Sequence, residues 1–470
     1  MQYFRSKHMS FFNTFKSWRT ALKIFTGLVI AMLSLLFVLK DKIMLGAEAY
    51  VYGYPLVIMD ITRAQSAIDI GPENELRRVR QFPDANFKDV VRPNVDTLYT
   101  TAFLSMKKGP WVFEMPAQFE RYELMPLMDA WTHVFASPGT RTRKGTLKGT
   151  GAIYLLAGPT WQGQVPEHMT LLRSPTDMVW LIGRTQTNGT ADYQTVHRIQ
   201  DNLRLYALNA PEKKPSTNTA PVLFSSHALP PVAQMKALST ASFFERLMQL
   251  MIDNPPAPQD APLLNRMALA GLKPGQAANL SWADGLSFSV GRWLANLKIK
   301  SVLNSKDSDG TWRTPPLNLG RYGTDYNTRA VVAMVGLGAN LPEDALYPNT
   351  ASDHQGKSLS GKHKYQIHFD AKQLPPVKAF WSITAYGPDE FLIDNPLRRY
   401  ALGDRDPLQY NADGSLDIWI QAEPPQDPQH HNNWLPVKAN ASFLLNARLY
   451  WPKDEALKLQ WQMPPVVRLD

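Results

Sequence analysis

Apolar residues change their spacing several times along this chain, and each change predicts a different kind of structure. The first pattern is an apolar run over residues 24–39, interrupted only by Thr26, Gly27 and Ser34. A helix that begins at Ala21 and includes this run is about 28 Å long at about 1.5 Å per residue, close to the hydrocarbon thickness of a bilayer. The run predicts an uncleaved transmembrane helix, with a cleaved signal peptide as the alternative.

Two later segments contain short apolar runs bounded by turn residues, which is typical of β-strands. In the first segment we expect strands at 98–106, 111–115, 122–135, 152–157 and 178–184. In the second we expect them at 329–334, 365–369, 379–386, 416–422, 443–449 and 457–461. Short strands at this spacing favour antiparallel sandwiches of the jelly-roll type.

Helical spacing, with apolar residues three and four positions apart, marks other stretches. We expect helices at 190–208, 277–302 and 47–63, the last one broken or kinked at Pro55. Residues 71–92 are polar and charged, so they predict a loop. Residues 211–231 are rich in Pro, Ser and Thr and predict a linker.

These patterns together predict a mainly β protein. It has two antiparallel β-sandwich domains joined by a helical segment and preceded by one transmembrane helix. The expected parts are a cytoplasmic tail with membrane anchor (1–45), an N-terminal sandwich (46–210), a linker with helices (211–319) and a C-terminal sandwich (320–470).

Charge and cysteine content narrow the functional classes. The formal net charge is +9, and residues 1–45 contain seven cations against one acid, so most of the excess lies at the N-terminus. Cations before the apolar run predict a single-pass inner-membrane protein with a cytoplasmic N-terminus and a periplasmic body. They do not form a basic stripe on a folded domain, so nucleic-acid binding is not predicted. The absence of cysteine excludes disulfides, thiolate metal sites and a cysteine nucleophile.

The strongest site candidate is Asp129-Ala-Trp131-Thr-His133. In a strand, Asp129, Trp131 and His133 would share one face, and the turn at Pro138 would bring Arg141 close to them. Histidine exchanges protons near neutral pH, and a neighbouring carboxylate can orient it. We therefore predict a catalytic role for Asp129, His133 and Arg141 in an envelope hydrolase that acts on a small or polymeric substrate.

Aromatic and amide side chains supply a second set, suited to a polyhydroxylated ligand. The predicted ligand-binding residues are Asn94, Asp96, Tyr99, Trp131, Tyr322, Tyr326 and Arg329. No cofactor is predicted; a divalent metal held by Asp96, Asp129 and His133 is the alternative.

Ordered motifs in both halves resemble one bacterial family. They include Arg92-Pro-Asn94-Val-Asp96-Thr-Leu-Tyr99, Asp129-Ala-Trp131, Gly139-Thr-Arg141, Trp381-Ser-Ile-Thr-Ala-Tyr386, Gly403-Asp404-Arg405 and Arg448-Leu-Tyr450-Trp451-Pro452. The chain is similar, from roughly residue 46 to 470, to the family whose halves are catalogued as domains of unknown function 1254 and 1214. The resemblance implies two jelly-roll sandwiches joined by helices, often exported or membrane-tethered, without a settled activity. The family pattern usually has Asn or Asp in place of His133, which favours a polar ligand contact over a universal catalytic role.

Three functions therefore stay open: an envelope hydrolase, a non-catalytic binder of a carbohydrate, lipid or metabolite, and a structural assembly module. The expected partners are the membrane, a small-molecule or envelope ligand, and, for the assembly module, further copies of the chain.

Overall fold

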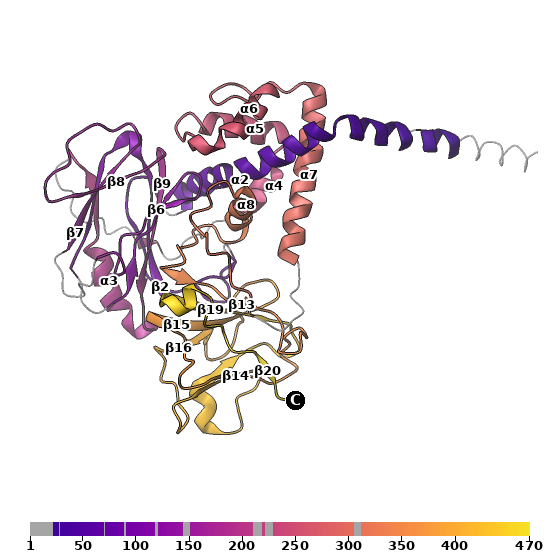
Figure 1. Ribbon diagram of the computed structural model, residues 1–470. Coiled ribbons are helices and arrows are strands. Elements are labelled where there is room, and N and C mark those ends of the chain that lie inside the picture. The colour runs from indigo at the N-terminus through magenta and orange to yellow at the C-terminus, as the bar shows by residue number, and fades with distance from the viewer. Residues whose placement is uncertain are drawn as a thin grey trace, which may run out of the picture.

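The computed structural model describes residues 22–27, 29–69, 71–88, 91–117, 121–143, 151–209, 219–220, 229–304 and 312–470. The predicted tail before residue 22 and most of the predicted linker at 211–231 lie outside these residues. Within them, the chain forms two β-rich halves, with helices packed beside the N-terminal half and between the two (Figure 1).

Two sheets make up the N-terminal half. The larger has the strand order β11-β1-β2-β9-β5-β6, with β4 also paired to β9, and the smaller has the order β10-β3-β7-β8. Most pairs are antiparallel, whereas β1–β11 and β7–β8 are parallel. The strands are β1 (Arg77–Val79), β2 (Thr97–Ser105), β3 (Trp111–Met115), β4 (Glu123–Leu124), β5 (Leu127–Asp129), β6 (Val134–Ala136), β7 (Ala152–Ala157), β8 (Thr170–Arg173), β9 (Met178–Gln186), β10 (Arg204–Ala207) and β11 (Thr219–Ala220).

The C-terminal half also contains two sheets. Their strand orders are β12-β19-β15-β16, with β13 also paired to β19, and β18-β17-β14-β20. The strands are β12 (Ala345–Leu346), β13 (Asn349–Thr350), β14 (Tyr365–Phe369), β15 (Val377–Tyr386), β16 (Ala401–Gly403), β17 (Leu416–Gln421), β18 (Trp434–Pro436), β19 (Leu444–Pro452) and β20 (Val467–Arg468).

The longest described helix, α2 (Lys40–Asp69), lies against the larger N-terminal sheet. The others are α3 (Tyr193–Asp201), α4 (Pro231–Ala237), α5 (Thr240–Leu250), α6 (Ala261–Leu269), α7 (Trp282–Asn304), α8 (Tyr326–Val335) and α9 (Asp454–Leu457), with 3-10 turns at Met106–Lys108, Thr190–Asp192, Pro258–Asp260 and Pro428–Asn433. Among the described residues, no helix is by itself long and apolar enough to cross a bilayer. The pair Leu22–Val38 and Lys40–Asp69 satisfies length and composition together, with a 63° bend between them.

Several predicted elements are wrong. The helix expected to break or kink at Pro55 runs unbroken from Lys40 to Asp69, because its dense burial outweighs the one hydrogen bond that proline removes. The strand expected at 329–334 is helix α8, whose N-terminus is capped by the Asp325 carboxylate accepting from the Thr328 amide at 3.1 Å. The strand expected at 457–461 is also absent, because Leu457 is the last residue of α9 and residues 458–461 form a turn and bend.

Two further expected elements are divided. The predicted helix at 190–208 ends at Asp201 and is followed by strand β10. The predicted strand at 122–135 consists of β4, β5 and the start of β6, separated by turns.

Alternate residues of paired strands β2 and β9 face two different cores. Leu104 and Leu181 belong to a cluster that includes residues of the smaller sheet, such as Phe113. On the other face, Phe103 and Trp180 are stacked with ring centroids 5.0 Å apart and pack in the cluster that contains α2 and α8. The β5–β6 turn also joins this second cluster, which positions the candidate site.

Candidate functional site

The predicted alternation of Asp129, Trp131 and His133 along one strand is wrong, because residues 130–133 form the turn between β5 and β6. The Asp129 carboxylate organises this turn: its Oδ1 accepts hydrogen bonds from the backbone amides of Trp131 and His133, both at 2.9 Å. Thr132 adopts φ 70° between them. Such local side-chain-to-backbone bonds are typical of aspartate turns and give this carboxylate a structural task.

The turn nevertheless brings predicted residues from two distant segments together. Arg329 of α8 is only 1% exposed. Its guanidinium carbon lies 5.3 Å from the ring centroids of Trp131 and Tyr52, and 5.1 Å from that of Tyr326. Rings at these distances attract a cation through their negative faces. We call Arg329, His133, Trp131, Tyr52 and Tyr326 the Arg329 cluster.

The hydrogen bonds of Arg329 leave part of its donor capacity unused. One terminal nitrogen, Nη1, lies 3.2 Å from His133 Nε2, and the other donates to the Tyr52 carbonyl oxygen at 3.3 Å. Its Nε is buried without a hydrogen-bond partner. No carboxylate of the described residues lies within ion-pair distance of this guanidinium.

His133 takes part as a neutral ring. Since arginine can only donate, Nε2 of His133 accepts, and the ring proton belongs on Nδ1. Burial, and then the charge of Arg329, lower the pKa of His133 to about 4. The ring of Tyr322 lies 5.6 Å from that of His133 at a tilt of 54°, so this predicted residue borders the same cluster.

Two acids stand near Arg329 but face other donors. Asp260 accepts hydrogen bonds from the phenols of Tyr326 at 2.8 Å and Tyr52 at 3.1 Å. Burial raises the pKa of Asp129 to about 7, against the opposing effect of its two amide donors and of Arg329. Both acids favour the charge of Arg329 electrostatically, whereas burial lowers the pKa of Arg329 itself.

Sequence reasoning missed two members of this site. Tyr52 belongs to a set of closely spaced tyrosines in α2 that resembles ordinary packing residues. Asp260 precedes α6 and resembles an N-cap, but its carboxylate makes no capping hydrogen bond and instead orients the two phenols.

Arg141 does not join Asp129 and His133. Its Nε donates to the Asp344 carboxylate at 2.6 Å, and the hydroxyl of Ser137 donates to the other oxygen of the same carboxylate at 2.6 Å. The three residues predicted to be catalytic are thus engaged with three different sets of partners.

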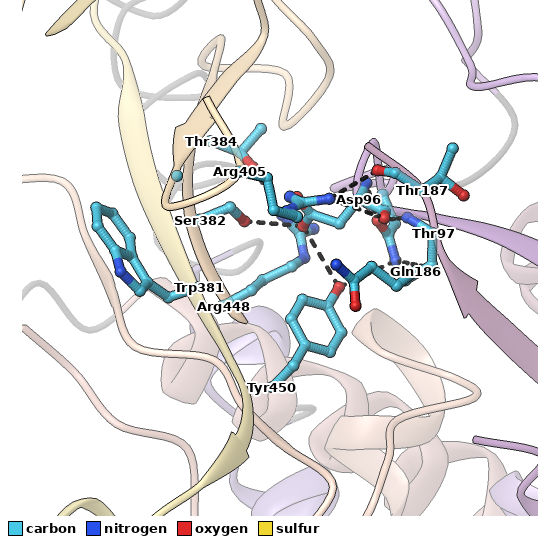
Figure 2. Close-up of polar contacts among 12 residues, drawn as sticks. Asp96, Thr97, Gln186, Thr187, Trp381, Ser382, Thr384, Arg405, Arg448 and Tyr450 are labelled. Atoms are coloured by element: carbon cyan, nitrogen blue, oxygen red, sulfur yellow. Dashed lines mark hydrogen bonds and ion pairs between the residues drawn. The ribbon is translucent and has the colours of Figure 1, made fainter. Parts of the chain in front are cut away.

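Asp96 lies in a separate polar network between the two halves (Figure 2), and Asn94 joins this network through Tyr450. Asp96 is fully buried and pairs with Arg405, while its Oδ2 accepts from the Ser382 hydroxyl at 2.8 Å. The Tyr450 hydroxyl lies 3.4 Å from the same oxygen and accepts from the Asn94 amide at 3.2 Å. The contacts of the Asp96 carboxylate with Arg405, Ser382 and Tyr450 therefore each join the N-terminal half to the C-terminal half.

Arginines complete this network. Arg405 also donates to the backbone carbonyls of Asp96 at 3.1 Å and Thr187 at 2.8 Å. Arg448 donates to the Tyr386 hydroxyl at 2.7 Å and to the Arg92 carbonyl at 3.1 Å. We had not predicted either arginine as a site residue, although both lie in the ordered C-terminal motifs.

Tyr99 lies at the edge of the network. Its hydroxyl is 3.4 Å from the Asn94 amide nitrogen, and the guanidinium of Arg184 lies 5.1 Å from its ring centroid. Within the described stretches, no three His, Asp or Glu side chains are grouped so that they could hold a metal ion.

Solved structures of other bacterial proteins are similar to this chain. The VPA0106 protein from Vibrio parahaemolyticus is 23% identical, with a TM-score of 0.67 over 91% of this chain and 100% of that one, which shows a shared fold. An uncharacterized protein from Burkholderia cenocepacia is 11% identical, with a TM-score of 0.44 over 93% and 96% of the two chains. No curated protein matches the sequence.

Family models match both halves. The model described as Protein of unknown function (DUF1254) matches residues 73–207, and DUF1214, also a protein of unknown function, matches residues 344–454. Together they cover just over half of the chain and confirm the family predicted from the ordered motifs, although we expected the resemblance to extend from roughly residue 46 to 470. The chain therefore belongs to the family that combines an N-terminal DUF1254 region with a C-terminal DUF1214 region.

Proposed function

We propose that this protein is a membrane-anchored envelope protein that binds a small carboxylate at the Arg329 cluster without chemical turnover. One observation supports the proposal above all: Arg329 is a buried cation whose guanidinium has an unused donor and no ion-pair partner among the described residues. A charge taken out of water is strongly destabilising unless it is paired. An anion bound at this position would remove that penalty.

The chemistry of the cluster favours a carboxylate. A guanidinium presents a planar fork that matches two carboxylate oxygens. The ring of Tyr326 is partly exposed and can stack against the body of a ligand, as in carbohydrate recognition, whereas the rings of Trp131 and Tyr52 are buried against the guanidinium. His133 and Tyr326 are partly exposed, so a ligand can approach from their side. An acidic sugar or a similar small organic acid satisfies both requirements.

A hydrolase at the same place receives less support. It requires the side chains of Asp129, His133 and Arg141 to face one space. Instead, the Asp129 carboxylate accepts from the amides of its own turn, and Arg141 pairs with Asp344. The pKa of His133, about 4, also makes it a weak base near neutral pH. These contacts support binding over acid/base catalysis.

The anchor is part of the proposal. Helix Leu22–Val38 extends away from the folded body as the indigo ribbon of Figure 1, and most of the net positive charge lies at the N-terminus. This arrangement supports a single-pass protein of the inner membrane, with two jelly-roll sandwiches in the periplasm.

Thermal unfolding of the full-length protein in detergent, dialysed free of small molecules, tests the binding function. Acetate, succinate, citrate, glucuronate and galacturonate serve as probes, with inorganic phosphate as a further anion. We expect at least one carboxylate to raise the melting temperature of the wild-type protein, because a ligand bound only to the folded state stabilises it. The shift should be absent in Arg329→Met.

The melting temperature of Arg329→Met without any added ligand provides a second test. Replacing an unpaired buried cation by methionine should raise the melting temperature, whereas replacing a structural arginine should lower it. The matched control is Arg266→Met, which removes an exposed arginine paired with Glu48 and should keep the ligand response. A lower melting temperature for Arg329→Met, with no carboxylate response in the wild type, would refute the proposal.

A further inference from the structure

Helix α7 presents an apolar stripe to the outside of the molecule. Trp282, Leu286, Trp293 and Leu297 are 75%, 42%, 60% and 45% exposed. They are separated by four, seven and four residues, so they lie on one face of the helix. Single exposed apolar residues are common on protein surfaces and need no explanation. A contiguous row that contains two tryptophans is unusual and marks an interaction site.

The opposite face of α7 is fixed to α2. Ser287 and Phe288 are fully buried there, and a Cβ at Gly291 would lie 2.4 Å from the Ile43 carbonyl oxygen. The two helix backbones therefore touch, and the apolar stripe is held pointing away from the body.

The crossing point lies next to the proposed anchor. Ile43 follows the end of helix Leu22–Val38 by five residues. Figure 1 shows α7 running across the end of α2 from which this N-terminal helix projects. A bilayer spanned by the projecting helix would therefore lie close to α7.

Charges near the start of α7 suit a membrane surface. Lys40 is exposed, and Lys42 forms a 2.7 Å salt bridge with Asp284 in the first turn of α7. Lysines near an apolar helix face attract anionic lipid headgroups, and tryptophans concentrate at the level of those headgroups.

We propose that the stripe of Trp282, Leu286, Trp293 and Leu297 lies in the headgroup region of the bilayer. The body then lies against the membrane surface, held by α7 as well as by the anchor. This inference rests on the anchor of the proposed function but not on the carboxylate site.

The absence of cysteine allows a direct test, since any introduced cysteine is the only one in the chain. Full-length variants Leu286→Cys, Leu297→Cys, Met32→Cys and Leu397→Cys are labelled with an environment-sensitive fluorophore. They are then reconstituted into nanodiscs of phosphatidylethanolamine and phosphatidylglycerol. Met32 reports the anchor, and Leu397, 53% exposed in the C-terminal half, is the matched control. Quenching by spin-labelled lipid and by aqueous iodide is compared.

We expect the labels at 286 and 297 to be quenched several-fold more by lipid than the label at 397, and several-fold less by iodide. If the label at 32 is quenched by lipid while those at 286 and 297 behave like the control, the anchor stands and the α7 surface is refuted. If only the label at 32 escapes quenching by lipid, the anchor is refuted, and with it the inference that α7 and the anchor hold the body together. Protection from both quenchers that grows with protein concentration would identify a second copy of the chain, and would equally overturn the inference.

Discussion

Removing the Asp96 carboxylate tests whether the network in Figure 2 joins the two halves into one stable body. Asp96→Ala leaves Arg405, whose side chain is only 13% exposed, without its ion-pair partner. It also removes the acceptor of the Ser382 hydroxyl. The neighbouring groups stay in place, so the loss of stability reports the buried contacts.

The magnitude follows from burial. Breaking a buried ion pair destabilises a protein by about 3–5 kcal/mol, because the remaining charge is left uncompensated. Arg405 keeps hydrogen bonds to two backbone carbonyls, which places the loss near the lower end. The lost serine bond adds about 1 kcal/mol. We therefore expect Asp96→Ala to lower the free energy of unfolding by about 4 kcal/mol.

Urea unfolding of the full-length protein, followed by tryptophan fluorescence, measures this loss. The matched control is Asp389→Ala, which breaks an exposed 3.0 Å salt bridge to Lys88 that also joins the two halves. Exposed pairs contribute less than about 1 kcal/mol. In a double-mutant cycle with Arg405→Met, the coupling energy should exceed about 1.5 kcal/mol, within the range for directly contacting residues. Equal losses in both aspartate variants, or a cycle that adds without coupling, would refute the account of the network.

Two further predictions concern helix packing and pH. Gly291→Ala should destabilise the protein because the new Cβ would lie 2.4 Å from the Ile43 carbonyl oxygen, whereas Gly285→Ala, with nothing within 4 Å, should stabilise it by up to about 1 kcal/mol; chemical unfolding compares them. The folded pKa of His133, about 4, lies below its ordinary value of 6.5, so its stabilisation is present above pH 6.5 and lost as pH falls towards 4. As the pH falls across this window, the melting temperature of His133→Gln should fall less than that of the wild type. The raised pKa of Asp129 has the opposite effect, but it acts in both proteins and does not change the comparison. An identical pH dependence of the two melting temperatures would contradict the lowered pKa of His133.

The sequence predicted the fold best where local pattern and tertiary packing agree. Strands at 111–115, 152–157 and 365–369 are confirmed with their predicted bounds. Prediction failed where tertiary packing decides. Residues 329–334 are apolar enough for a strand, but the Asp325 cap and the packing against α2 favour a helix.

The candidate site shows the same division. Residue types identified Trp131, His133, Tyr326 and Arg329 in two separate segments, but only the fold shows that they meet. The periodicity of a strand placed Asp129 beside them as a catalytic acid. In the structure, residues 130–133 form a turn with a positive φ at Thr132, and the Asp129 carboxylate accepts from the amides of Trp131 and His133, which no alternation pattern can reveal.

The central claim is that the Arg329 cluster binds a small carboxylate, and native mass spectrometry tests it most directly. The full-length protein, released gently from membranes without dialysis, is compared with Arg329→Met and with the Arg266→Met control. We predict that wild type and control carry a small organic acid that dissociates on unfolding, and that Arg329→Met carries none. The same adduct on all three proteins, or no adduct on any of them together with an unchanged melting temperature in every carboxylate, would contradict the account.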